Sequence, residues 1–260
     1  MDQFQRTSVL LSPAGIDRLA EARVAVFGIG GVGGYVCEAL VRSGLGHIAL
    51  IDNDTVAETN LNRQIIALHS TIGRQKTEVM AERLRDINPS VDIATYPMFY
   101  LPETADQIDL SAFDYVVDAV DTVVAKLELI VRCKALHVPI LCAMGAGNKL
   151  DPSQLRITDI SKTSVDPLAK VIRVACKKRH IHSLKVAWTT EPVIPGSPEA
   201  EHEDTNRRSL PGSAAFVPSA MGLLIASQVV KDLLRWDLKT VLEQRTAQQS
   251  TENNTEANHA

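Results

Sequence analysis

The sequence predicts an α/β fold built on a doubly wound, mainly parallel sheet, and two observations lead to this prediction. Short apolar stretches typical of buried strands alternate with longer stretches of helical period between residues 24 and 143, an order that gives parallel strands joined by crossover helices. The first apolar stretch, Val24–Phe27, runs directly into the glycine-rich turn Gly28–Gly33 and then into a helix. Because ligands of such sheets bind at the carboxyl ends of the strands, the site is expected there.

The elements of this region follow in order from pattern and punctuation. After a short helix over 12–21, strands are expected over 24–27, 48–51, 91–96, 115–118 and 140–143, with helices over 33–43, 74–87 and 124–136. The helix over 74–87 is amphipathic and is stopped by Asn88-Pro89. Residues 91–96 alternate between apolar and polar as a half-buried strand does. Together these elements predict a Rossmann-like region over residues 23–150, preceded by a helical arm over 1–22.

The character of the chain changes after residue 150. Two further strands are expected over 155–160 and 184–189, with a helix over 167–179 between them and a last core helix over 221–235. Residues 151–236 therefore extend the same domain with C-terminal strands and a helix. The stretch 191–208 is polar and contains proline, which predicts a mobile crossover. Residues 246–260 are rich in Gln, Asn and Thr and predict a disordered tail.

Composition places the chain among ordinary globular proteins. Its 260 residues can bury one substantial core, and its hydrophobic content of 45% is typical. The N-terminus lacks the apolar core of a signal peptide. No apolar run is expected to be long enough to span a bilayer, because Pro218, Ser219, Ser227 and Gln228 interrupt residues 216–230, which suit a buried helix instead. We therefore expect a cytoplasmic protein with no membrane partner.

The charge pattern argues against a global attraction to nucleic acid. The formal net charge is −4, so an RNA partner would need a local basic patch. One candidate cluster is formed by Arg173, Lys177, Lys178, Arg179, His180 and Lys185. A solvated helix face is the ordinary interpretation of such a charge run, and contact with RNA is the alternative.

The cysteines discriminate between classes of enzyme. Cys37, Cys133, Cys142 and Cys176 form no C-x-x-C pair, so a structural zinc site of that spacing is not expected. The crossover 191–208 contains no cysteine. The four cysteines are best interpreted as small buried apolar residues.

The glycine-rich turn and the next strand predict a nucleotide site. Free backbone N–H groups at a helix N-terminus attract phosphate, and Gly28, Gly30, Gly31 and Gly33 let the backbone turn tightly and approach it. Asp52 follows about 20 residues later, where a carboxylate accepts hydrogen bonds from ribose hydroxyls. These features alone would also fit an NAD-dependent oxidoreductase.

Fixed cations after the second strand favour a nucleotide whose phosphates react. Charge that develops on a triphosphate under attack needs cations such as Arg63 and Lys76, and Asp121 after the fourth strand is a candidate Mg²⁺ ligand. Lys76 has two interpretations, a solvated residue that opens a helix or a cation that binds an anion. A cation near a helix N-terminus is disfavoured by the dipole, so a bound anion would explain Lys76. Asp118 is expected to have a structural role.

Neighbouring polar residues have two interpretations each. Asp54 either caps a turn or lies near the nucleotide. Asn60 and Asn62 are either loop formers or functional groups, and their position beside Arg63-Gln64, just after a nucleotide-binding strand, favours function.

Together these motifs resemble the adenylating domain of the ubiquitin-activating-enzyme-like superfamily, which includes the bacterial ThiF- and MoeB-type enzymes. The resemblance rests on the glycine turn, the Asp-x-Asp at 52–54, Asn-x-Asn-Arg-Gln at 60–64, Gly-x-x-Lys at 73–76 and Asp-Ala-x-Asp at 118–121. Within that superfamily, residues 4–7, 83–89, 162–169 and 211–218 resemble the tRNA threonylcarbamoyladenosine dehydratase branch. The lack of a C-x-x-C pair departs from ThiF- and MoeB-type relatives.

The resemblance implies ATP and Mg²⁺ as cofactors, with a monovalent cation, Na⁺ or K⁺, left open. It assigns Gly31 to the ATP phosphates, Asp52 to the ribose, Asp121 to magnesium, and Asn62, Arg63 and Lys76 to the triphosphate. It also assigns Arg6 to the ATP of a neighbouring subunit, which requires a homodimer.

The activity implied by the resemblance is ATP-dependent cyclisation of threonylcarbamoyladenosine in tRNA, through an adenylate of its threonyl carboxylate. The residues alone support carboxylate adenylation and go no further. The alternatives are an activating enzyme for a ubiquitin-like or sulfur-carrier protein C-terminus, an NAD-dependent oxidoreductase and a non-enzymatic tRNA-binding scaffold. Sulfur-trafficking partner proteins, the tRNA-contacting residues and the ordering of 191–208 are left open by the sequence.

Overall fold

The computed structural model describes residues 3–195, 211–239 and 241. Seven strands form one sheet: β1 (Arg23–Phe27), β2 (His47–Ile51), β3 (Asp92–Tyr96), β4 (Tyr115–Asp118), β5 (Ile140–Ala143), β6 (Leu155–Asp159) and β7 (Lys185–Thr189). Their order is β3-β2-β1-β4-β5-β7-β6. All neighbours are parallel except β6, which runs antiparallel to β7. The predicted α/β class and mainly parallel sheet are confirmed.

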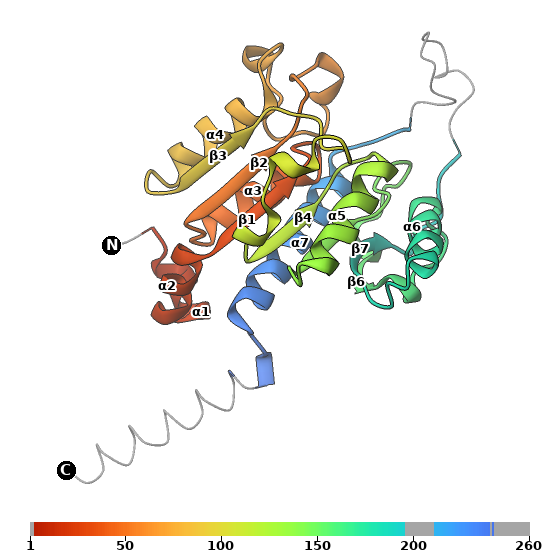
Figure 1. The fold of residues 1–260 in the computed structure, drawn as a ribbon. Helices are drawn as coiled ribbons and strands as arrows, with labels where there is room; N and C mark the ends of the chain where they lie inside the picture. The colour runs from red at the N-terminus through yellow and green to blue at the C-terminus, as the bar shows by residue number, and fades with distance from the viewer. Residues whose placement is uncertain (1–2, 196–210, 240, 242–260) are drawn as a thin grey trace, which may run out of the picture.

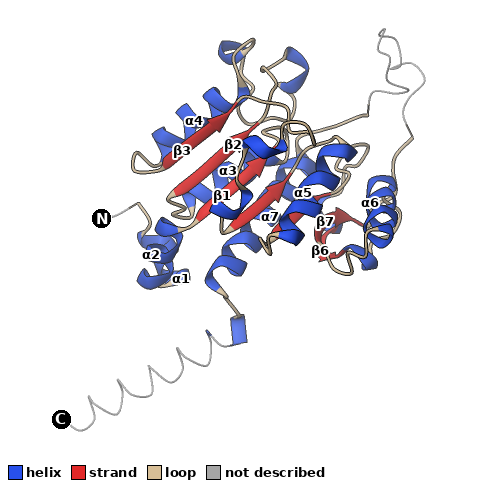
Figure 2. Cartoon of the chain, viewed as in Figure 1, coloured by secondary structure: helices blue, strands red, loops and turns tan. Residues whose placement is uncertain are grey.

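Helices cover both faces of this sheet (Figure 1; Figure 2). One layer contains α3 (Gly33–Arg42), α4 (Lys76–Ile87) and α7 (Phe216–Leu234), and the other contains α5 (Val123–Ala135) and α6 (Pro167–Lys178). Each layer encloses its own apolar cluster, because residues on β1 such as Val26 and Phe27 point to opposite faces. The fold is therefore doubly wound, as predicted.

The N-terminal helices lie at the end of the sheet where the strands begin. They are α1 (Gln5–Leu11) and α2 (Pro13–Glu21). Backbone hydrogen bonds from Gly46 to Leu19 and from His47 to Ala22 fix the end of α2 beside the start of β2. The predicted helix over 12–21 is confirmed as α2, with Ser12 capping Gly15 N–H. This places α1 and α2 away from the carboxyl ends of the strands.

Two expectations differ from the structure in extent. The last helix was expected from residue 221 but begins at Phe216, because Pro218 lies in its first turn, where a missing N–H has no helical partner to lose. The strand expected over 91–96 is confirmed as β3, but it is an edge strand in which only Ile93 and Tyr96 are half-buried. The tail expected over 246–260 and most of the crossover expected over 191–208 lie outside the described residues.

Helix α7 explains the longest apolar run of the sequence. Among the described residues it alone is long and apolar enough to cross a membrane by length and composition. The expectation that no run reaches that length is therefore wrong. Its burial fits a core helix, since Val217, Met221, Ile225 and Val229 are fully buried in the layer with α3. The interpretation of this stretch as a buried helix is confirmed.

Candidate functional site

A cavity of about 500 Å³ opens at the carboxyl ends of β1, β2 and β4. This is where the strand order reverses direction, since β1 pairs with β2 on one side and β4 on the other. The structure brings ten of the thirteen predicted site residues to this cavity: Gly28, Gly30, Gly31, Asp52, Asp54, Asn60, Arg63, Gln64, Lys76 and Asp121. Gly33, Asn62 and Arg6 are absent from its lining, for reasons given below.

The glycine-rich turn is built by steric necessity. Gly28 has a φ of +87°, and a Cβ there would lie 2.6 Å from the carbonyl oxygen of Ala119. A Cβ on Gly33 would lie 1.8 Å from the carbonyl oxygen of Gly28. Gly33 therefore packs behind the turn at the start of α3 instead of lining the cavity. Together these glycines hold the N-terminus of α3 against the cavity, where its free N–H groups and dipole favour an anion.

Asp52 joins the end of β2 to the glycine turn. Its carboxylate accepts a 2.6 Å hydrogen bond from Ile29 N–H and a 2.8 Å bond from Asp54 N–H. Burial raises the pKa of Asp52, while the positive charge of Lys76 and the two N–H donors oppose that rise. Each carboxylate oxygen keeps a second lone pair, so Asp52 can still accept hydrogen bonds from a ligand in the cavity.

Lys76 is a buried cation at the first position of α4. Its side chain is only 6% exposed, and its Nζ lies 2.7 Å from a carboxylate oxygen of Asp54, whose side chain is 58% exposed. The interpretation of Lys76 as a solvated residue is wrong. The anion expected beside this cation is supplied in part by the Asp54 carboxylate. The backbone carbonyl of Asp54 also accepts a hydrogen bond from Lys76 N–H.

Arg63 reaches the cavity from a short loop that follows β2. Its Nη1 donates to Thr59 O at 2.8 Å and to Asn62 Oδ1 at 2.9 Å. Asn62 in turn donates to Ser213 O at 2.8 Å. Asn62 is therefore a buttress outside the cavity that ties Arg63 to the segment before α7. Both contacts use Nη1, so the guanidinium keeps further N–H donors for a ligand.

The two neighbouring amides differ in their environment. Asn60 Oδ1 accepts from Ala57 N–H at 3.1 Å and closes a local turn. Neither Asn60 nor Asn62 has a positive φ, so unusual backbone angles do not explain them. Gln64 is buried, and its Oε1 has no hydrogen-bond partner within the described part of the chain.

Asp121 lies on the loop after β4 and is exposed at the cavity. Its carboxylate accepts a 3.2 Å hydrogen bond from Thr122 Oγ1. No group of three or more His, Cys, Asp or Glu that could hold a metal occurs in residues 3–195, 211–239 and 241. A single exposed carboxylate fits Mg²⁺, which is commonly held by one or two carboxylates together with substrate phosphates.

Asp118 has the structural role predicted for it, through a partner that sequence reasoning missed. Lys126 of α5 places its Nζ 3.0 Å from both Asp118 oxygens and 2.8 Å from Ala143 O, and both side chains are fully buried. Asp118 also accepts from Val120 N–H. This pair fixes the ends of β4 and β5 and the loop that carries Asp121.

Arg6 lies far from this constellation within one chain. It is exposed on α1, at the end of the sheet where the strands begin. A contribution of Arg6 to the cavity therefore requires a second subunit, as the resemblance implies.

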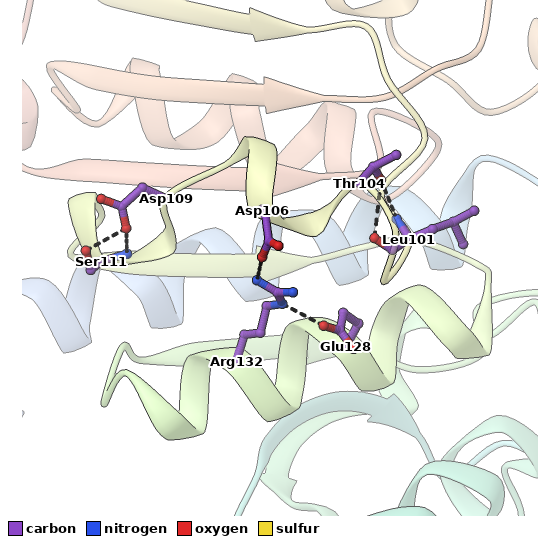
Figure 3. Close-up of polar contacts among 7 residues, drawn as sticks. All are labelled: Leu101, Thr104, Asp106, Asp109, Ser111, Glu128 and Arg132. Carbon is purple, nitrogen blue, oxygen red and sulfur yellow. Dashed lines mark hydrogen bonds and ion pairs between the residues drawn. The ribbon is translucent and has the colours of Figure 1, made fainter.

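The loop from β3 to β4 supplies cavity residues that sequence reasoning missed. Met98, Phe99 and Tyr100 line the cavity, and Tyr100 packs edge-on against Phe27 at a centroid distance of 4.9 Å. Their position just after the third expected strand was a signal that could have identified them. Figure 3 shows how the loop is anchored. Arg132 of α5 donates hydrogen bonds to Asp106 of the loop and to Glu128 of its own helix, and Leu101 N–H donates to Thr104 Oγ1. A second short turn is closed by hydrogen bonds from Ser111 N–H and Ser111 Oγ to Asp109 Oδ1.

The four cysteines are buried and unpaired, as predicted. Burial raises the pKa of each thiol, that of Cys133 to about 12. Thiols of this kind are poor nucleophiles, because the thiolate is the reactive form. None of them lines the cavity.

A larger hollow of about 990 Å³ lies at the opposite end of the sheet. Four of its polar side chains form one hydrogen-bonded group, in which Asp232 accepts from Tyr115, Lys185 and Gln228. It contains none of the predicted site residues.

Fold and site together define a nucleotide-binding α/β protein in which an arginine and a buried lysine flank the phosphate-binding turn. The chain belongs to the ThiF family, whose model matches residues 4–259. It is 41% identical to the tRNA threonylcarbamoyladenosine dehydratase of Bacillus subtilis, over 90% of this chain and 96% of that relative. It is 37% identical to the enzyme of the same name from Haemophilus influenzae, over 87% and 91%.

Solved structures agree with these relatives. The Escherichia coli tRNA N6-threonylcarbamoyladenosine dehydratase TcdA, in complex with ATP or with AMP, matches with a TM-score of 0.81 and 34% identity. The match covers 90% of this chain and 94% of that chain.

Proposed function

We propose that this protein is an ATP-dependent dehydratase that cyclises N6-threonylcarbamoyladenosine beside the anticodon of tRNA. The observation that carries the proposal is the cavity at the glycine turn, where Arg63 and Lys76 flank a site suited to a triphosphate. Near full-length similarity to dehydratases, one of them solved with ATP and with AMP, supports the choice of substrates.

In the first step of the proposed reaction, the threonyl carboxylate attacks the α-phosphate of ATP. The products are an acyl-adenylate and pyrophosphate. Asp52 holds the ribose, the turn Gly28–Gly33 and the start of α3 hold phosphate, and Arg63 and Lys76 stabilise the charge that develops on the transferring group. Fixed cations in a partly closed cavity do this well, because they need no reorganisation when the charge appears.

Asp121 is the proposed ligand of a magnesium ion bound together with the phosphates. The ion would supply charge neutralisation on the phosphate oxygens. Asp121 is exposed at the cavity, and within the described part of the chain its carboxylate accepts a hydrogen bond only from the neighbouring Thr122, so it is available to a ligand.

In the second step the carbamoyl nitrogen attacks the activated carbonyl carbon. A C–N bond forms, the acyl–phosphate bond breaks, AMP leaves, and the nitrogen loses its proton. The nucleoside thereby loses one water and becomes a cyclic hydantoin. No enzyme nucleophile is needed, which agrees with the burial of all four cysteines away from the cavity.

We further propose a cytoplasmic homodimer in which Arg6 of one subunit reaches the cavity of the other. The exposure of Arg6 on α1, at the far end of its own sheet, supports a role in trans. A mixture of the Arg6→Ala and Lys76→Ala proteins would then recover part of the activity. No recovery in a mixture shown to exchange subunits would contradict the trans assignment.

The test of the proposed chemistry is product analysis with wild-type, Arg63→Ala and Lys76→Ala proteins. We expect AMP and pyrophosphate only when tRNA carrying threonylcarbamoyladenosine is present. Each variant should lose activity by about two to three orders of magnitude, given roughly 3–4 kcal/mol for one preorganised charge contact. Turnover driven instead by the C-terminus of a ubiquitin-like or sulfur-carrier protein would contradict the substrate assignment, and a normal rate in either variant would remove that residue from the mechanism.

A further inference from the structure

The helix α6 begins a stretch of the chain that carries only positive charge. Residues 167–190 contain no Asp or Glu, although the whole protein has a net charge of −4. The cations of this stretch are Lys170, Arg173, Lys177, Lys178, Arg179 and Lys185. A concentration of one sign of charge within an acidic protein points to a function for that surface.

Arg179 donates to Ala175 O of α6, and the structure divides the other five cations into two groups. Arg173 turns inward and donates to Thr163, and Lys185 pairs with Asp232. Lys170, Lys177 and Lys178 are exposed on the outer face of α6, opposite the buried Ala169, Ile172 and Cys176.

The three outer lysines differ from the seven Lys and Arg side chains of the described chain that pair with carboxylates. Within the described part of the chain, carboxylates pair with Arg42, Arg74, Lys76, Arg83, Lys126, Arg132 and Lys185. Among residues 3–195, 211–239 and 241, no such ion pair involves Lys170, Lys177 or Lys178. Their charge is therefore available to a partner from solution.

The position of α6 connects this face to the cavity. Its N-cap residue Asp166 accepts a 3.0 Å hydrogen bond from Gly145 N–H. Ala146, which follows Gly145 in the chain, lines the cavity. From there α6 runs beside β6 and β7 at the end of the sheet (Figure 1). The lysines span about 12 Å along the helix, at 1.5 Å per residue over eight residues.

We propose that the outer face of α6, defined by Lys170, Lys177 and Lys178, binds the phosphate backbone of the tRNA whose modified nucleoside occupies the cavity. This inference rests on the proposed function. Lysine is a flexible point charge that suits phosphate. The half-exposed Val171 and Val174 lie between the lysines and offer apolar contact to sugar and base edges. With a net negative protein, affinity for RNA has to come from such a local contact.

The experiment compares two triple variants of the full chain that remove the same charge. The test variant is Lys170→Gln/Lys177→Gln/Lys178→Gln. The control is Arg23→Gln/Arg85→Gln/Lys231→Gln, which replaces three exposed residues outside α6. Thermal unfolding establishes that both fold, and calorimetric titration with ATP is expected to give the wild-type affinity for both.

Filter binding of tRNA at several salt concentrations is the deciding measurement. Losing three phosphate contacts should reduce the slope of log affinity against log salt by about 2–3, at roughly 0.7–0.9 per contact. We expect at least about tenfold weaker binding for the test variant, with the control close to wild type. Equal losses in the two variants would overturn the proposal.

Two further outcomes separate this inference from the proposed function. If wild-type protein dehydrates the tRNA and the α6 variant does so with an unchanged KM for tRNA, the α6 proposal fails and the proposed function stands. If wild-type protein neither binds nor dehydrates the tRNA, both fail. Binding of wild-type protein to anionic lipid vesicles that the test variant loses, with tRNA affinity unchanged, would reassign the face to membranes.

Discussion

The buried pair of Lys126 and Asp118 gives a prediction whose magnitude follows from the structure. Replacement of Lys126 by Met keeps the length of the side chain but removes three hydrogen bonds, two to Asp118 and one to Ala143 O. Because Asp118 is fully buried, its charge then has no cationic partner. Breaking a buried pair in this way costs about 3–5 kcal/mol.

The assay is thermal and urea unfolding of the wild type and three variants. At about 2–4 °C per kcal/mol for a chain of this size, Lys126→Met should lower Tm by roughly 6–20 °C. The double variant Asp118→Asn/Lys126→Met removes the stranded charge and should recover about 2 kcal/mol of that loss. Lys134→Met, a matched change at a less buried lysine of the same helix, should stay within about 0.5 kcal/mol of wild type.

The reasoning would be refuted by a loss below about 1 kcal/mol in Lys126→Met. It would also be refuted if the double variant were no more stable than the single one, since the charge left on Asp118 is the cause of the predicted cost.

Three more predictions follow from the site and its supports. Gly33→Ala places a Cβ 1.8 Å from Gly28 O, so the turn must shift and ATP affinity should fall at least about tenfold by calorimetry; wild-type affinity would contradict the steric argument. Burial acts to raise the pKa of Glu38, but hydrogen bonds from Arg83 and Arg42 outweigh it and lower that pKa below 4.5. Glu38 therefore contributes stability above pH 4.5 that is lost as pH falls below it. Below pH 4.5, the Tm of Glu38→Gln should decline less steeply with falling pH than the Tm of the wild type. Equal slopes in the two proteins would be the contrary result. Burial raises the pKa of Asp52 above 3.8, so ATP affinity should weaken at a higher pH than the one at which an ordinary aspartate protonates. Asp52→Asn should bind ATP about 10–100-fold more weakly and should lack this pH dependence. An identical pH profile in the two proteins would remove Asp52 from the site.

The strands and the phosphate-binding turn were predictable because local pattern determines them. Buried parallel strands are short and continuously apolar, and residues 24–27 and 115–117 show this directly. Gly28 and Gly33 are required by a positive φ and by a close approach of backbone, both of which only glycine permits. Residues at the carboxyl ends of such strands meet at one edge of the sheet, so Asp52 and Asp121 could be placed together from sequence.

Features that depend on contacts between distant segments could not be predicted. The pair of Lys126 with Asp118 joins a helix to a strand, and nothing in the sequence pattern of α5 distinguishes Lys126 from the less buried cations Arg132 and Lys134 of the same helix. The burial of Lys76 follows from the path of residues 52–76, which wraps the lysine side chain against Asp54. Likewise, the bond from Asn62 to Ser213 closes a separation of 151 residues. Pro218 suggested that the apolar run is interrupted. In the structure it lies in the first turn of α7, where an N–H has no helical acceptor and its absence costs nothing.

The central claim, cyclising dehydration of a tRNA nucleoside, is tested most directly by mass spectrometry of nucleosides. The tRNA carrying threonylcarbamoyladenosine is incubated with the protein, ATP and Mg²⁺, then digested under conditions that preserve the cyclic product. The account predicts that threonylcarbamoyladenosine loses the mass of one water molecule, only when ATP is present and not with Lys76→Ala. An unchanged nucleoside, with protein whose ATP binding has been verified, would contradict the account.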